Sequence, residues 1–234
     1  YGGSAVVSNS GDITITNNAD GDAVGIRASS SGKYAEGSTV VNNSGDIMVS
    51  SPYQAAGIWA TSTNDASIYN SGNITVASEE GRARGLYAIA DDGVGTIINS
   101  GDLSVVGGIG VVGAGAAGSY GATTINTGDI SVTSTRYEVL TDYYGVDYYA
   151  GGWAYGAFAA TRVIGVAAVI NSGDIDVNGI TRGTGLSANS RFGSTYIANE
   201  GDLTVNGELE SAYGINTSGN SREEFIYGET GYTT

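Results

Sequence analysis

The phrase INSGDIDV at residues 170–177 decides the fold of this 234-residue chain, because close copies of it return along the whole sequence. Three of them are NSGDITIT at 9–16, NNSGDIMV at 42–49 and INSGDLSV at 98–105. Aligned on their glycine, seven copies are separated by 34, 27, 29, 27, 45 and 28 residues. These glycines are Gly11, Gly45, Gly72, Gly101, Gly128, Gly173 and Gly201. Self-similarity at a period of 20–50 residues is typical of a stacked repeat, in which each unit packs on its neighbours.

The aligned positions separate by chemical type. Two residues before the glycine stand Asn9, Asn43, Asn70, Asn99, Asn126, Asn171 and Asn199. One residue after it stand Asp12, Asp46, Asn73, Asp102, Asp129, Asp174 and Asp202. Apolar, mostly β-branched residues follow two and four positions after it, with mostly polar residues between them. Alternation with period two predicts a strand that has one buried face.

A second phrase, Ala-x-Gly-apolar-x-Ala, lies between the copies of the first. It stands at 23–28, 55–60 and 83–88, and returns with changes at 154–159, 183–188 and 212–217. Each period therefore holds three short strands. The sequence predicts an all-β chain that forms a single-stranded parallel β-helix, or β-solenoid, of about seven coils of roughly 28 residues.

Each polar position of the phrase receives a structural role. We expect the asparagines to form an interior ladder, with each amide bonded to the asparagine of the next coil and to nearby backbone. The glycine is expected to supply a positive φ at a tight corner. The aspartate is expected to accept a backbone N–H within its own turn. We expect no cofactor; Ca²⁺ bridging the aspartates of adjacent coils is the alternative.

The longest interval contains an aromatic insertion at residues 137–153, YEVLTDYYGVDYYAGGW. Insertions in repeat proteins form loops on one face, often the face that binds. Tyr and Trp beside acidic groups suit stacking on sugar rings or anchoring at a protein interface. Local packing, against the solenoid flank or as an extra hairpin, is the alternative. The candidate contact residues are Tyr143, Tyr144, Tyr148, Tyr149, Trp153 and Tyr155.

A fainter aromatic strip passes through Trp59, Tyr87 and Phe158, which share one position of the second phrase. Rows of this kind sometimes mark lateral association. We interpret this one as ordinary sheet surface.

Residues 1–220 are predicted to form the solenoid, and residues 221–234 depart from the repeat. That last segment is expected to be a cap, a swapped strand or part of an assembly contact. End coils of a solenoid carry unpaired strand edges, which favour end-to-end self-association.

Composition restricts the function classes. The net charge of −15, from 24 acidic and 9 basic residues, argues against a nucleic-acid partner. The chain contains no run of about 20 apolar residues, which a transmembrane helix would need. The absence of cysteine argues against a disulfide scaffold and suits a polypeptide exported unfolded. A chain that starts with Tyr1 suggests a processed protein or an excised segment.

Catalytic signals are poor. The chain has no His and no Cys, which removes most triads and the usual zinc sites. Adjacent carboxylates such as Glu79 and Glu80 point to opposite faces of a strand and do not form an acid/base pair. We therefore expect no enzyme; the alternative is a carbohydrate-active β-helix of the polysaccharide lyase or glycosidase type.

The alternating NSGD and AxGIxA phrases resemble the passenger regions of bacterial autotransporter-type surface proteins, over nearly the whole chain up to about residue 217. The resemblance implies a right-handed parallel β-helix located extracellularly or on the bacterial cell surface. Passengers of this shape include adhesins, proteases and esterases, but the catalytic motifs of the enzymatic members, such as Gly-x-Ser-x-Gly, are missing here. We therefore expect a non-enzymatic structural or adhesive role, as a stalk, an adhesin or a self-assembling fibre subunit. Expected partners are further copies of the chain and cell-surface glycans or proteins.

Overall fold

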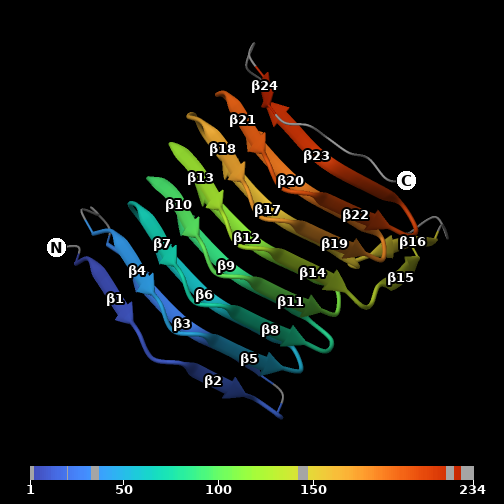
Figure 1. Cartoon of the computed structure of the whole chain (residues 1–234), viewed down its shortest axis with the longest axis horizontal. Coiled ribbons are helices and arrows are strands. Elements are labelled where there is room, and N and C mark those ends of the chain that lie inside the picture. The colour runs from blue at the N-terminus through green and yellow to red at the C-terminus, as the bar shows by residue number, and fades with distance from the viewer. Residues whose placement is uncertain (1–2, 20, 33–36, 142–146, 220–223, 228–234) are drawn as a thin grey trace.

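The computed structural model describes residues 3–19, 21–32, 37–141, 147–219 and 224–227. This part of the chain is all-β, with three parallel sheets stacked as a solenoid (Figure 1). No helix long and apolar enough to cross a membrane is found in it. The predicted fold class is confirmed.

Each coil contributes one strand to each sheet, so that strands from successive coils pair side by side (Figure 1). The first sheet contains β1 (Ala5–Asn9), β4 (Thr39–Asn43), β7 (Ala66–Asn70), β10 (Val94–Asn99), β13 (Gly121–Asn126), β18 (Ala167–Asn171), β21 (Thr195–Asn199) and β24 (Glu224–Tyr227). The second contains β2 (Ile13–Thr16), β5 (Ile47–Ser51), β8 (Ile74–Ser78), β11 (Leu103–Gly107), β14 (Ile130–Ser134), β19 (Ile175–Gly179) and β22 (Leu203–Gly207). The third contains β3 (Asp22–Ser30), β6 (Gln54–Ser62), β9 (Arg82–Ala90), β12 (Gly110–Gly118), β17 (Trp153–Thr161), β20 (Arg182–Ser190) and β23 (Ser211–Gly219).

The core lies between the three sheets and consists of columns of equivalent residues. In the second sheet, Ile47, Ile74, Leu103, Ile130 and Ile175 stand in register and are almost completely buried. The third sheet contributes a column of alanines that includes Ala60, Ala88 and Ala116. Burying each large aliphatic side chain stabilises the fold by about 1.5–3 kcal/mol relative to leaving it exposed. The small residues allow the third sheet to approach the other two closely.

The asparagines form a continuous ladder along the first sheet. Each Nδ2 from Asn9 to Asn171 donates a hydrogen bond of 2.7–2.8 Å to Oδ1 of the asparagine in the next coil. The same Nδ2 donates to the carbonyl oxygen of the glycine two residues on, as at Asn99 and Gly101 (2.6 Å). The ladder therefore joins the coils and also holds the corner of each coil, which is the arrangement expected from the sequence.

The expected role of the glycine in the phrase is wrong. Among the described residues, only Gly151, Gly152 and Gly165 have a positive φ, and none of these belongs to the phrase. The reason for glycine is the distance between coils: a Cβ on Gly101 would lie against the carbonyl oxygen of Gly72, closer than van der Waals contact allows. The same clash recurs in each coil after the first, whereas a Cβ on Gly11 would meet no atom within 4 Å.

The segment after residue 220 contains β24, which pairs in parallel with β21. Its backbone register places Glu224 beside Thr195 and Tyr227 beside Ala198. This strand therefore adds an eighth member to the first sheet, although its sequence departs from the repeat.

Candidate functional site

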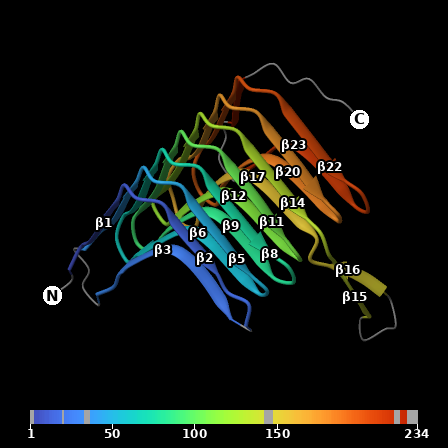
Figure 2. The same ribbon diagram turned by 60° about the horizontal axis from the view of Figure 1, so that its bottom comes forward.

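The 45-residue interval contains an antiparallel hairpin formed by β15 (Glu138–Thr141) and β16 (Asp147–Ala150), with Val139 in register with Tyr149. Figures 1 and 2 show the hairpin projecting away from the stack between β14 and β17. It is the one element of the described residues that leaves the three sheets. An extra hairpin is one of the alternatives that the sequence left open for this insertion, and the backbone of β15 and β16 has that form.

Two glycines return the chain from the hairpin to the solenoid. Gly151 and Gly152 have φ of 78° and 71°, a left-handed conformation that favours glycine. The Gly152 N–H donates to Ile109 O (2.7 Å), and Gly152 O accepts the Ser134 hydroxyl (2.7 Å) and the Thr181 N–H (2.9 Å). These bonds to the coils on both sides fix the foot of the hairpin on the stack.

A cleft of about 400 Å³ lies at this foot, and we call it the hairpin-foot cleft. Its lining residues are Tyr149, Gly151, Trp153, Tyr155, Thr181, Arg182 and Glu210. They come from the hairpin, from β17 and from the two following coils. The cleft therefore combines aromatic side chains with one cation and one anion.

Three of the six predicted contact residues line this cleft. Tyr149 is 44% exposed and makes an edge-to-face contact with Tyr137, with 5.3 Å between ring centroids. Trp153 and Tyr155 make a similar contact at 5.7 Å. Tyr143 and Tyr144 lie outside the described residues, and the side chain of Tyr148, which belongs to β16, also lies outside them.

The polar side of the cleft was not predicted from the sequence. Arg182 Nη2 lies 3.8 Å from Glu210 Oε2, and both side chains are well exposed. The Thr181 hydroxyl donates to Gly151 O at 2.6 Å. Arg182 stands in register with Trp153 on the neighbouring strand. Each of these two residues directly precedes a copy of the second phrase, at 154–159 and at 183–188, and this shared position is the sequence signal that could have placed them side by side.

The cleft continues into an aromatic row on the outer face of the third sheet. Phe158 contacts Tyr155 (6.2 Å between centroids) and Tyr87 (6.1 Å), and Tyr87 contacts Trp59 (6.1 Å). Gly115 of β12 lies in register between Tyr87 of β9 and Phe158 of β17. Because Gly115 has no side chain, the ring of Phe158 can lie over it. The three strip residues predicted from the sequence therefore form a connected row of edge-to-face contacts.

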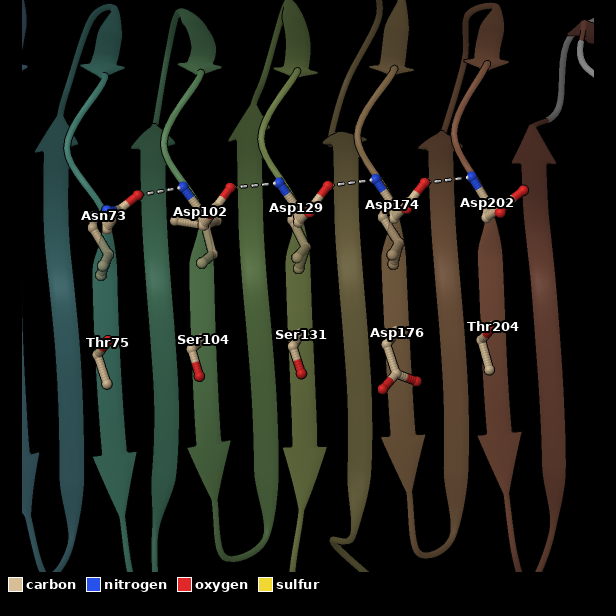
Figure 3. Close-up of a pocket in the computed structure, with 14 residues that line it drawn as sticks. Asn73, Thr75, Asp102, Ser104, Asp129, Ser131, Asp174, Asp176, Asp202 and Thr204 are labelled. Atoms are coloured by element: carbon tan, nitrogen blue, oxygen red, sulfur yellow. Dashed lines mark hydrogen bonds between the residues drawn. The ribbon is translucent and has the colours of Figure 1, made fainter.

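The aspartate column lies on a different flank, beside a shallow groove of about 520 Å³ over the second sheet (Figure 3). Each Oδ1 from Asp12 to Asp174 accepts the backbone N–H of the equivalent residue in the next coil, with N···O distances of 2.8–3.0 Å. The expectation of a bond within the same turn is wrong, because the backbone donor nearest to each carboxylate belongs to the adjacent coil. Asn73 fills the same position, with its Oδ1 bonded to the Asp102 N–H at 3.0 Å.

One oxygen of each aspartate from Asp12 to Asp174 thus accepts a backbone donor of the next coil. No group of three or more His, Cys, Asp or Glu able to hold a metal ion occurs among the described residues. The column links coils through hydrogen bonds, as the asparagine ladder does on the inside.

No family model, curated protein or solved structure matches this chain in comparisons of sequence and fold.

Proposed function

We propose that the chain is a non-enzymatic structural and adhesive β-helix, which acts outside the cell or on a bacterial surface. In this proposal the solenoid is the stalk and the hairpin-foot cleft is the contact site. The observation that carries the proposal is the position of the cleft, whose lining includes Tyr149 and Gly151 at the base of the hairpin. Figure 2 shows that this hairpin leaves an otherwise regular stack.

The chemistry of the cleft favours a glycan or a protein surface as its partner. Aromatic rings offer large, rigid faces with little entropy to lose on binding. The rings of Trp153 and Tyr155 stand beside the donors of Arg182 and the acceptors of Glu210. This mixture suits a sugar, which has apolar C–H faces and polar hydroxyl edges.

The proposal is tested by measuring retention of the purified chain on a glycan array and on bacterial or host cell surfaces. A triple variant, Tyr149→Ala with Trp153→Ala and Tyr155→Ala, is expected to lose binding at least tenfold. The matched control is Tyr53→Ala with Tyr69→Ala and Tyr120→Ala, which removes three exposed tyrosines away from the cleft. Binding that is equally weakened in both, or release of cleaved glycan in place of retention, would reject the proposal.

A self-associating version of the same role is favoured by the first coil. Val7, Ile13 and Ile15 are only partly buried, whereas their register partners Val41, Ile47 and Val49 are at most 1% exposed. These apolar residues suit the stacking of another coil with the same repeat pattern on β1 and β2.

Sedimentation velocity over a wide concentration range tests this version. We expect oligomers that disappear in Gly11→Ala, because a Cβ there would meet a stacked coil as it does within the chain. A monomer at every concentration would reject self-association and leave the adhesive proposal intact.

A further inference from the structure

A second recess lies on the outer face of the third sheet, over the first three coils and away from the hairpin. Its polar lining consists of Asp22 and Arg27 of β3, Gln54 and Trp59 of β6, and Arg84 of β9. We call it the Trp59–Arg84 recess. Its volume is about 30 Å³. One water needs roughly 10–15 Å³ on this measure, so the recess has room for about two oxygen-sized atoms.

Two hydrogen-bond donors on the lining side chains are buried without an acceptor. Trp59 Nε1 and Arg84 Nη1 have no hydrogen-bond partner among the described residues. A buried donor without a partner costs about 1–3 kcal/mol, and a charged donor costs more. Most buried polar groups are paired, so two adjacent exceptions need a physical explanation.

The guanidinium groups of Arg27 and Arg84 both lie close to the Trp59 ring. The guanidinium carbon of Arg84 lies 5.2 Å from the Trp59 ring centroid and 5.1 Å from that of Tyr87. The guanidinium carbon of Arg27 lies 5.4 Å from the same Trp59 ring. The whole chain has only nine basic residues against 24 acidic ones, so two arginines on one ring form a local cationic patch in an acidic protein.

The charge of Arg84 is not fully compensated by its surroundings. Burial lowers the pKa of its guanidinium, and Arg82 adds to this effect, while Tyr87 and Asp22 act in the opposite direction. None of the ion pairs among the described residues includes Arg84. With Asp22 as the one acidic residue against Arg27 and Arg84 in the lining, one bound anion would balance the remaining charge and supply the missing acceptors.

We infer that the Trp59–Arg84 recess binds a carboxylate group, whose two oxygens accept hydrogen bonds from Trp59 Nε1 and Arg84 Nη1. The recess has room for the two oxygens of one carboxylate, whose carbon would lie at the mouth, and the donor set contains one neutral and one charged N–H. The ligand is either the acid group of a uronic sugar or a free small carboxylate. This site is independent of the hairpin-foot cleft and of the proposed adhesive role.

Isothermal titration calorimetry at constant ionic strength tests the inference with sodium glucuronate, sodium acetate, glucose and sodium chloride as separate probes. We expect glucuronate and acetate to bind and glucose and chloride not to bind. Tighter binding of glucuronate would assign the sugar acid, and equal binding would assign the free carboxylate. Binding of glucose or chloride as tight as that of acetate, or no binding of either acid, would overturn the inference.

Variants locate the site. Arg84→Gln is expected to weaken acetate binding at least tenfold, and Trp59→Phe, which keeps an aromatic ring of smaller size but removes the N–H, several-fold. The control Arg191→Gln also removes an arginine that lies over a ring, at Phe192, far along the chain from the recess, and should leave binding unchanged. A thermal unfolding curve shows whether each variant is folded. Unchanged binding in folded Arg84→Gln would contradict the inference.

Fluorescence provides a second readout, because Trp59 and Trp153 are the only two tryptophans. In a Trp153→Phe background all tryptophan emission comes from Trp59. Acetate should change this emission with the same saturation curve that calorimetry gives, and binding without any change in emission would place the carboxylate elsewhere.

Discussion

Asn99 Nδ2 donates one hydrogen bond to Asn126 Oδ1 in the next coil (2.7 Å) and a second to the carbonyl oxygen of Gly101 in its own coil (2.6 Å). One buried amide therefore joins two coils and closes a corner. Because Asn70 donates to Asn99 in turn, every bond of the side chain is inside the protein. The ladder links the chain across separations of 27–45 residues, where no local interaction could hold the coils in register.

Removing one member of the ladder should be costly. Asn99→Ala leaves the Asn70 amide, the Asn126 amide and the Gly101 carbonyl each without one partner, so we expect a loss of about 1–3 kcal/mol of unfolding free energy. Urea unfolding followed by circular dichroism measures it. Asn178→Ala is the control and should change little, because the half-buried Asn178 has solvent-exposed bonds only, accepting from Asn206 and donating to Asp176. Equal losses in the two variants would show that the buried ladder has no special role.

The glycine of the phrase should tolerate no methyl group inside the stack. Gly101→Ala places a Cβ against the Gly72 carbonyl oxygen, and we expect about 1–3 kcal/mol of destabilisation from overpacking. Gly11→Ala is the matched control, because its Cβ would meet no atom within 4 Å in the same chain. If thermal unfolding shows the two variants equally stable, close approach between coils is not what requires glycine.

The aspartate column should depend on an acceptor and not on charge. Asp102→Asn keeps an oxygen for the Asp129 N–H and removes repulsion along the column, so its stability should equal or exceed that of the parent. Asp102→Ala should lose about 1 kcal/mol. Urea midpoints compare the two directly. Equal destabilisation in both variants would mean that the negative charge itself is required.

The fold could be predicted from the sequence because the repeated phrase is present in every coil. The asparagine ladder could be predicted because the same polar residue recurs on a buried strand face, where it needs a hydrogen-bond partner, and the asparagine of the next coil supplies one. For Gly101 and Asp102 the sequence favours roles within their own turn, because a glycine and an aspartate at a corner are common in single turns. Both residues act across coils. Thr181, Arg182 and Glu210 could not be predicted as cleft residues, because the cleft exists only where the insertion places Tyr149 and Gly151, and that depends on how the insertion folds.

Deletion of residues 137–151 is the most direct test of the claim that the solenoid is a support and the hairpin foot its contact site. It joins Arg136 to Gly152 and leaves a connection of three residues between β14 and β17, the same length as that between β8 and β9. Because the Arg136 N–H donates to Gly108 O and the Gly152 N–H to Ile109 O, the shortened coil keeps its bonds to the coil below.

The measurement is surface and glycan binding of this deletion variant beside its thermal unfolding. The account predicts a midpoint within about 5 °C of the parent, because the stack is unchanged, together with loss of binding. Full binding by the folded deletion variant would contradict it and would move the contact site to another face of the solenoid.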